Sequence, residues 1–268
     1  DGDKSLSIRF VLFSSLSQGK CSATNLLSSE DVNSAINIIK RLGIKIKSKN
    51  KKCEIFGNGL FGYKFKKNLI LNAGNSGTTA RLMMPLLNNS TDWVKITGDQ
   101  SLRKRDMSRI TKPLRLFGFK FKNNSERLPL LIKGPKILKP ISFTENLGSA
   151  QCKSAIMIAA LKAKGKTKIK CLPSRNHSEL MFNNLMKIST KIYKKNNYEF
   201  IELNGLKEVK PFKYKIPGDI SSASFFVVLT LLSKKSSLII RDVNTNPSRI
   251  GFIKILNKMG SKIKFLNK

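Results

Sequence analysis

The amino-acid sequence predicts an α/β protein of the α+β type, built from one unit that is repeated along the chain. In four segments an amphipathic helix ends near a small residue, and a short strand of alternating Lys and apolar residues follows. A small residue just past a helix relieves a left-handed backbone, and a period of two is typical of a half-buried strand. The segments are 41–46, 116–121, 187–192 and 258–263, and their Gly or Ser positions lie 75, 71 and 71 residues apart. This period indicates a whole unit of strands and helices rather than a solenoid turn.

A second strand follows in each of the first three units and ends before a glycine. These strands are 53–56 before Gly57, 129–132 before Gly134 and 199–202 before Gly205. Each unit therefore contains strands and two helices, with the helices packed on one face of a sheet. The fourth unit reaches Lys268 after its first strand. We expect three complete units and the start of a fourth.

Three helices are clear from the apolar pattern. The first runs from Asp31 to Leu42, with a cap from Ser28 or Ser29, and the others cover 149–162 and 221–232. Ser and Asp side chains before such a run accept the free N–H groups of the first turn, so Asp219 is expected to cap the third helix. The basic residues on the far sides of these helices are most simply a solvated face.

Composition limits the function classes. The chain has 268 residues, 40% of them hydrophobic and 25% charged, and no apolar run approaches the roughly 18 residues that span a bilayer. Its four cysteines are widely spaced and His177 is its only histidine. A zinc site is therefore disfavoured, and reduced thiols in the cytoplasm are expected.

The formal net charge of +35 raises the alternative of a basic RNA-binding module, because phosphate backbones attract such surfaces. However, 40 of the 51 basic residues are Lys, spread along the chain and mixed with Asn and Ile. This spread is typical of a Lys/Asn/Ile-biased proteome. The sequence also lacks an RNP-like aromatic motif, a zinc finger and a recognition-helix signature, so we expect no nucleic-acid partner.

The segment 71–84 has the strongest functional signal, because a short apolar strand runs into a Gly/Ser/Thr turn and then a helix. Gly74 and Gly77 allow a sharp turn and a close approach to a ligand, and the first N–H groups of the helix point at the same place. These features suit a phosphate or a carboxylate. Ordinary turn and cap chemistry explains the turn equally well when it is taken alone. It is not a nucleotide P-loop, which needs a Lys after the second Gly.

Four further segments pair small polar residues with Lys or Arg: 2–9, 98–107, 148–154 and 173–177. In this order, and together with 217–223 and 246–249, they resemble 5-enolpyruvylshikimate-3-phosphate (EPSP) synthase over nearly the entire chain. The resemblance implies six βαβαββ units in two lobes, with the active site in the cleft between them. Residues 1–215 would form the first lobe, and residues 216–268 the start of a truncated second lobe.

The resemblance also implies the roles of individual residues. Lys4 would be catalytic and lie between both substrates. Shikimate 3-phosphate would be bound by Lys4, Ser5, Arg9, Ser149, Ala150, Gln151 and Ser174. Phosphoenolpyruvate would be bound by Lys4, Asn75, Gly77, Arg105 and Gln151. For Ser149 and Ser174 alone, helix capping is the simpler interpretation, and His177 is at least as well explained by a structural hydrogen bond.

The reaction implied is transfer of the enolpyruvyl group to the 5-hydroxyl of shikimate 3-phosphate in the shikimate pathway, without a cofactor or a metal. The protein would be a cytoplasmic monomer with no membrane partner. Other catalytic residues of the family lie in the second lobe, so we expect this chain to bind shikimate 3-phosphate weakly and to be inactive alone. One departure matters: Asp106 stands where a Pro is usual, and its carboxylate could pair with Arg105.

The nearest alternative in chemistry is UDP-N-acetylglucosamine enolpyruvyl transferase, which has the same fold. That branch carries a Cys on the loop between the second and third units, where this chain has 100–107 and no Cys. It is therefore disfavoured.

Overall fold

The structure is a computed structural model that describes residues 1–122 and 125–266. Its α-helices are α1 Lys4–Ser14, α2 Glu30–Arg41, α3 Gly77–Met83, α4 Gln100–Arg103, α5 Ser108–Leu116, α6 Ala150–Ala160, α7 His177–Leu180, α8 Ile220–Leu232 and α9 Gly251–Lys258. A 3₁₀ turn, Met84–Leu87, continues α3, and a π-helical turn, Met181–Leu185, continues α7. Within the described ranges, no helix is both long and apolar enough to cross a membrane.

The strands are β1 Gln18–Thr24, β2 Lys45–Lys49, β3 Lys52–Asn58, β4 Ile70–Asn72, β5 Val94–Thr97, β6 Lys120–Phe121, β7 Leu130–Lys133, β8 Ser142–Glu145, β9 Lys166–Cys171, β10 Thr190–Lys195, β11 Tyr198–Asn204 and β12 Lys213–Lys215. They form three four-stranded sheets, ordered β12-β1-β3-β2, β4-β5-β7-β6 and β8-β9-β11-β10. In each sheet the first two strands named are parallel and the other pairs are antiparallel. The predicted repeat is therefore confirmed as a βαβαββ unit.

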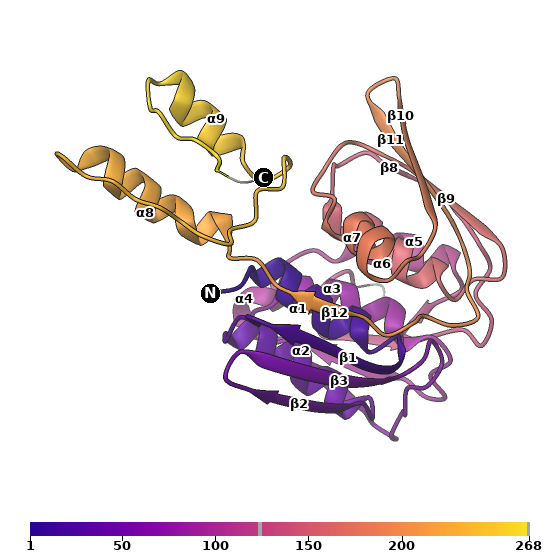
Figure 1. The fold of residues 1–268 in the computed structure, drawn as a ribbon. Coiled ribbons are helices and arrows are strands. Elements are labelled where there is room, and N and C mark those ends of the chain that lie inside the picture. The colour runs from indigo at the N-terminus through magenta and orange to yellow at the C-terminus, as the bar shows by residue number, and fades with distance from the viewer. Residues whose placement is uncertain (123–124, 267–268) are drawn as a thin grey trace.

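The first unit differs from the other two in the origin of its first strand. The chain begins with α1, and the parallel partner of β1 is β12, which follows the third unit. Ser22 pairs with Lys213, and Thr24 pairs with Lys215. The last strand before residue 216 thus closes the first sheet (Figure 1).

The glycine that follows the second predicted strand of each unit has a common structural reason. A Cβ built there would collide with a backbone carbonyl oxygen beyond the unit's first helix. The distances are 2.3 Å from Gly57 to Ser17 O, 2.1 Å from Gly134 to Leu87 O and 1.8 Å from Gly205 to Ala163 O. Real Cβ atoms do not come this close to backbone atoms, so the repeated glycine allows strand and helix end to pack together.

Two separate groups of apolar side chains are buried. The larger extends from Leu6 to Ile216 and takes in all three sheets, while the smaller consists of Ile220, Ala223, Ile250 and Ile253 between α8 and α9. Figure 1 shows α8 and α9 projecting from the rest of the molecule near the N-terminus. The division at residue 215 stays a prediction, and the two separate cores support it.

The strand predicted at the start of the fourth unit is wrong for the residues that the structure describes. After α9, residues 261–266 have no strand assignment. The Asn257 side chain instead bonds both backbone groups of Ile263, at 3.0 Å each. A strand needs a neighbouring strand to hydrogen-bond its backbone N–H and C=O groups. Here the Asn257 side chain bonds the N–H and C=O of Ile263 in place of such a neighbour.

The segment before α1 lies against the segment before α8. Gly2 forms an antiparallel bridge with Gly218, which also bridges Val243. Asp3 and Asp219, which cap α1 and α8, lie 3.4 and 3.2 Å from the guanidinium nitrogens of Arg249. The predicted cap at Asp219 is thus confirmed, and Arg249 ties both caps together.

Candidate functional site

The N-terminus of α1 carries the first predicted site residues. The buried Asp3 side chain accepts the N–H of Leu6, so the helix begins at Lys4. Lys4 is exposed and its ammonium lies 3.1 Å from a carboxylate oxygen of Asp31. Its backbone N–H donates to Asp219 across the chain, at 3.2 Å. The lysine is therefore held at its backbone, while its side chain stays accessible.

Arg9 lies one turn further along α1 and is buried. Its Nε donates to Ser178 Oγ at 2.9 Å, Nη2 to Ser154 Oγ at 3.3 Å, and Nη1 to the Ser5 carbonyl at 3.2 Å. Burial is the main reason that the pKa of Arg9 falls to about 10. These bonds use three of the five N–H donors of the guanidinium. Arg9 therefore joins α1 to α6 and α7, and its predicted contact with shikimate stays a prediction.

The turn before α3 positions Asn75 and Arg105. Gly74 adopts a φ of 57°, and the Ser76 side chain caps the helix that begins at Gly77. The Asn75 amide donates to Asp99 at 2.6 Å and accepts from Arg105 Nη2 at 3.0 Å. A Cβ at Gly77 would lie 3.2 Å from Arg105 Nη1. Glycine at this position thus leaves room for the guanidinium beside the turn.

Asp106 does not form the ion pair with Arg105 that its sequence position allowed. Its carboxylate accepts the backbone N–H of Ser108 at 2.7 Å and the Ser108 hydroxyl at 2.6 Å, and these bonds hold the pKa of Asp106 below its ordinary value. The Asp106 side chain therefore stabilises the start of α5. The ion pairs among the described residues include none between Asp106 and Arg105.

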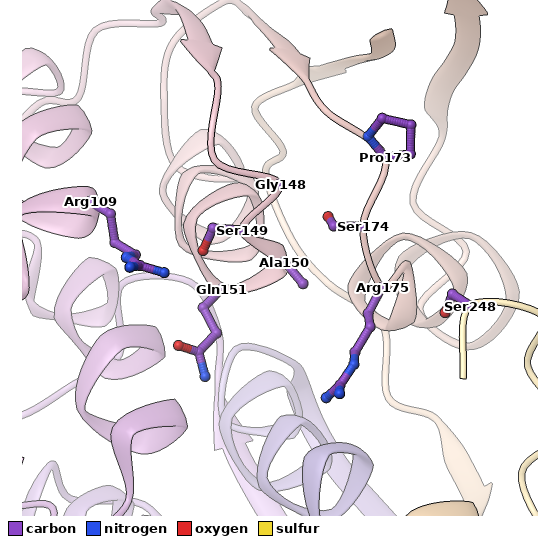
Figure 2. A pocket seen from close by; sticks show the side chains of 9 residues that line it. All are labelled: Arg109, Gly148, Ser149, Ala150, Gln151, Pro173, Ser174, Arg175 and Ser248. Carbon is purple, nitrogen blue, oxygen red and sulfur yellow. The ribbon is translucent and has the colours of Figure 1, made fainter. Parts of the chain in front are cut away.

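A cavity of about 620 Å³ opens at the N-terminus of α6 (Figure 2). Ser149 caps the helix by accepting the N–H of Cys152 at 3.3 Å, which confirms the capping interpretation. For Ser174 the capping interpretation is wrong, because Asn176 stands at the N-cap of α7 and the buried Ser174 Oγ has no hydrogen-bond partner in the part of the chain that the structure describes. The cavity is lined by Arg109, Gly148, Ser149, Ala150, Gln151, Pro173, Ser174, Arg175 and Ser248.

Positive charge gathers around this cavity and the neighbouring turn. In Figure 2 the side chains of Arg109 and Arg175 reach it from two sides, with Gln151 between them. Burial and then the charges of Arg109 and Arg105 lower the pKa of Arg81. Burial and then the charge of Arg249 likewise lower the pKa of Arg175. Guanidinium groups that repel one another in this way form a region suited to an anion.

Buried charges support the cavity from behind. Lys153 of α6 is fully buried, and its ammonium lies 2.5 Å from Glu179 and 3.0 Å from Glu199. Burial opposes the charge on Lys153, but the two carboxylates raise its pKa above the ordinary value. This triad joins α6 to α7 and β11. It follows that the loop carrying Ser174 is anchored beside the start of α6.

His177 is buried, and its imidazole contacts a side chain of the protein interior. Burial, together with the charges of Arg9 and Arg249, lowers its pKa to about 3, so the imidazole is neutral. Its Nε2 lies 3.5 Å from the Asn244 amide nitrogen, and that nitrogen also donates to Asp3. His177 is not among the residues that line the cavity. This agrees with the structural interpretation of His177.

Comparison with known proteins identifies the family. The sequence model of the protein family EPSP synthase (3-phosphoshikimate 1-carboxyvinyltransferase) matches residues 1–267. The chain belongs to the EPSP synthase family. A relative from Caldicellulosiruptor saccharolyticus, named 3-phosphoshikimate 1-carboxyvinyltransferase, is 41% identical over 99% of this chain and 61% of its own length. A relative of the same name from Petrotoga mobilis is also 41% identical, again over 99% of this chain and 61% of its own length.

The fold agrees with solved structures of the EPSP synthase family. A structure of EPSP synthase from Acinetobacter baumannii superimposes with a TM-score of 0.84 and 34% identity, and it covers 97% of this chain and 58% of that one. The chain thus spans about three fifths of the length of the relatives that it matches. The predicted family and fold are confirmed.

The structure brings some of the predicted site residues together and keeps others apart. Ser149, Ala150, Gln151 and Ser174 line one cavity, whereas Lys4 does not line it. Asn75, Gly77 and Arg105 form a second group around the α3 turn. The Gln151 side chain connects the two groups through bonds to Thr78 and Arg81, at 2.9 and 2.8 Å.

Sequence analysis missed three residues of the cavity. Arg175 follows Ser174 directly, so its place in the same short motif was the available signal. Arg109 lies on α5 and Ser248 lies before α9, each more than 35 residues from the nearest cavity segment. Ser248 belongs to the segment 246–249, one of the motifs of the family resemblance, although that segment was given no role in the site. Nothing in the local sequence marks Arg109, because only the packing of the units brings it to the cavity.

Proposed function

We propose that the protein carrying this chain transfers the enolpyruvyl group of phosphoenolpyruvate to the 5-hydroxyl of shikimate 3-phosphate, in the shikimate pathway. The hydroxyl oxygen would add to C2 of phosphoenolpyruvate while C3 takes a proton. The adduct would then lose phosphate and a proton from C3, which restores the double bond. The observation that carries the proposal is the cavity at α6, which combines two guanidinium groups with a buried hydroxyl that no described residue hydrogen-bonds.

The two groups of site residues suit the two substrates. The 3-phosphate would lie at the start of α6, against Ser149, the Ala150 backbone and Ser174. Phosphoenolpyruvate would lie at the α3 turn, against Arg105 and the Gly77 backbone. Holding two anions side by side requires fixed positive charge, which the enzyme would supply before the reaction starts. Lys4 would provide a further point charge between them.

Membership of the EPSP synthase family supports the remaining parts of the proposal. We propose that the protein works in the cytoplasm as a monomer, on small-molecule substrates alone. The absence of a Cys from residues 100–107 disfavours the UDP-N-acetylglucosamine branch. The gathering of Arg109 and Arg175 at one cavity, rather than along a stripe of basic residues, favours a small anion over RNA.

Binding of shikimate 3-phosphate to the 268-residue chain, measured by isothermal titration calorimetry, tests the proposal. Arg175→Ala should weaken binding by about 10-fold or more, because a charge-assisted hydrogen bond contributes about 1.5–3 kcal/mol. Arg41→Ala is the matched control, since it removes the same charge from the exposed end of α2. Equal affinities for both variants would contradict the proposed cavity.

Two other outcomes would decide between the proposed reaction and its alternative. Salt-dependent binding of single-stranded RNA that shikimate 3-phosphate does not displace would favour the RNA-binding alternative. Formation of EPSP from phosphoenolpyruvate and shikimate 3-phosphate by the 268-residue chain would support the reaction. It would also contradict the expectation that this chain is inactive alone.

A further inference from the structure

Arg81 lies between the two groups of site residues and belongs to neither. It is a half-buried residue of α3, and none of the ion pairs among the described residues includes it. Its Nη1 donates to Gln151 Oε1 at 2.8 Å, and its Nη2 donates to the Asp106 carbonyl at 3.1 Å. Burying a guanidinium that no carboxylate pairs is costly, and the Arg81 Nε is buried with no hydrogen-bond partner among the described residues.

The Gln151 amide is held from both ends. Its oxygen accepts from Arg81, and its nitrogen donates to Thr78 Oγ1 at 2.9 Å. A side-chain amide has two N–H donors, so one donor remains on Gln151. Gln151 lines the cavity, and the two bonds keep its amide oxygen directed at Arg81. The end of the amide with a donor left for an anion is therefore its nitrogen.

Orientation matters because the two ends of an amide have similar shapes and opposite polarity. If the amide rotated by half a turn, its oxygen would replace the N–H donor beside the anion. Arg81 prevents this rotation, because a guanidinium donates only and cannot accept from the amide nitrogen. The same guanidinium also binds the carbonyl of Asp106, the residue after Arg105. Arg81 thus holds the Gln151 amide of α6 and also the backbone next to Arg105, which belongs to the other group of site residues.

We propose that Arg81 is a positioning residue which, with Thr78, orients the Gln151 amide so that its free N–H donates to the bound anionic substrate. This inference rests on the proposed function, and it names how the site selects an anion. Lys cannot replace Arg here, because a single ammonium does not reproduce the fork that reaches Gln151 and Asp106 together. Thr78 contributes only its hydroxyl, so Ser should replace it and Val should not.

A double-mutant cycle on shikimate 3-phosphate affinity tests the proposal. Arg81→Lys and Thr78→Val should each weaken binding about 3- to 10-fold, in line with the loss of one hydrogen bond, while Thr78→Ser should stay within about 2-fold of the unmodified chain. In a Gln151→Ala background, neither Arg81→Lys nor Thr78→Val should weaken binding further, because the amide through which they act is gone. Arg115→Lys, on the far end of α5, is the matched control.

Three results would overturn the proposal. An Arg81→Lys loss that persists in the Gln151→Ala background would mean that Arg81 contacts the ligand directly or supports the fold alone. Full affinity of Thr78→Val would mean that the amide needs no second partner. A second measurement needs no ligand: the Gln151 side-chain N–H bonded to Thr78 should exchange slowly by NMR, and faster in Arg81→Lys. Equal exchange rates overturn the inference while leaving the proposed function intact, whereas absence of binding by the unmodified chain removes both.

Discussion

Lys162 follows α6 and is a buried lysine without an acidic partner. It is 4% exposed, and no ion pair among the described residues includes it. Its ammonium donates to the Leu86 carbonyl at 3.4 Å and to Asn88 Oδ1, and lies 4.9 Å from the centre of the Tyr63 ring. Burial lowers the pKa of Lys162 from 10.5 to about 7. The free energy of unfolding should therefore depend on pH.

The direction and size of this dependence follow from the two pKa values. Between pH 7 and 10.5 the unfolded chain binds more protons at Lys162 than the folded chain does, so stability from this group rises with pH. Below pH 7 both states are protonated, and the contribution is constant. At about 1.4 kcal/mol per pKa unit, the rise between pH 7 and pH 9 is about 2 kcal/mol. Lys162→Met should remove this rise.

Urea unfolding at pH 7 and pH 9, followed by the fluorescence of the single tryptophan, Trp93, measures the effect. The control is Lys164→Met, which makes the same change at an exposed position two residues away. Between the two pH values, the unfolding free energy of Lys164→Met should increase by about 2 kcal/mol more than that of Lys162→Met. Comparing two variants cancels the opposing effect of buried cysteines, whose pKa values burial raises. Equal changes for both variants would refute the reasoning.

Two further predictions concern packing behind the site. Lys153→Met should lower the free energy of unfolding by about 3–5 kcal/mol at pH 7, because it leaves two carboxylates buried without a cation. The loss should be smaller at pH 5, because burial raises the pKa of the Glu179 carboxyl and favours its neutral form as the pH falls. An equal loss in urea titrations at both pH values would contradict this. Gly205→Ala should lower stability by about 1–3 kcal/mol or more, because its Cβ would meet the Ala163 backbone. Gly251→Ala, which meets nothing within 4 Å, is the control in thermal unfolding, and equal melting temperatures would argue against the glycine packing.

Much of the repeat was predictable because it rests on local patterns. The helix predicted from Asp31 to Leu42 is α2, Glu30–Arg41, with the expected cap at Ser29. The glycines at 57, 134 and 205 were visible as a regular feature, although their collision with backbone carbonyls was not. Caps and alternating strands depend on near neighbours in the chain, so they can be predicted before the fold is known.

Some residues of the candidate site were predictable from the sequence, and others were not. Ser149 and Ser174 lie in short motifs that the sequence displays, whereas Arg109 comes to the same cavity from a different unit. Asp106 shows the opposite case. Its sequence position beside Arg105 allowed an ion pair, but the Ser108 N–H and hydroxyl donate to the carboxylate instead.

By itself, the sequence determined the repeated unit, its helices and caps, and the motifs through which the chain resembles the EPSP synthase family. Only the tertiary structure decided that β12 completes the first sheet, that Arg249 ties two helix caps, and that Arg81 holds the Gln151 amide. The reason is physical. Helix, strand and turn preferences act over a few residues, whereas these contacts join residues 30 to 246 positions apart and exist only once the units have packed.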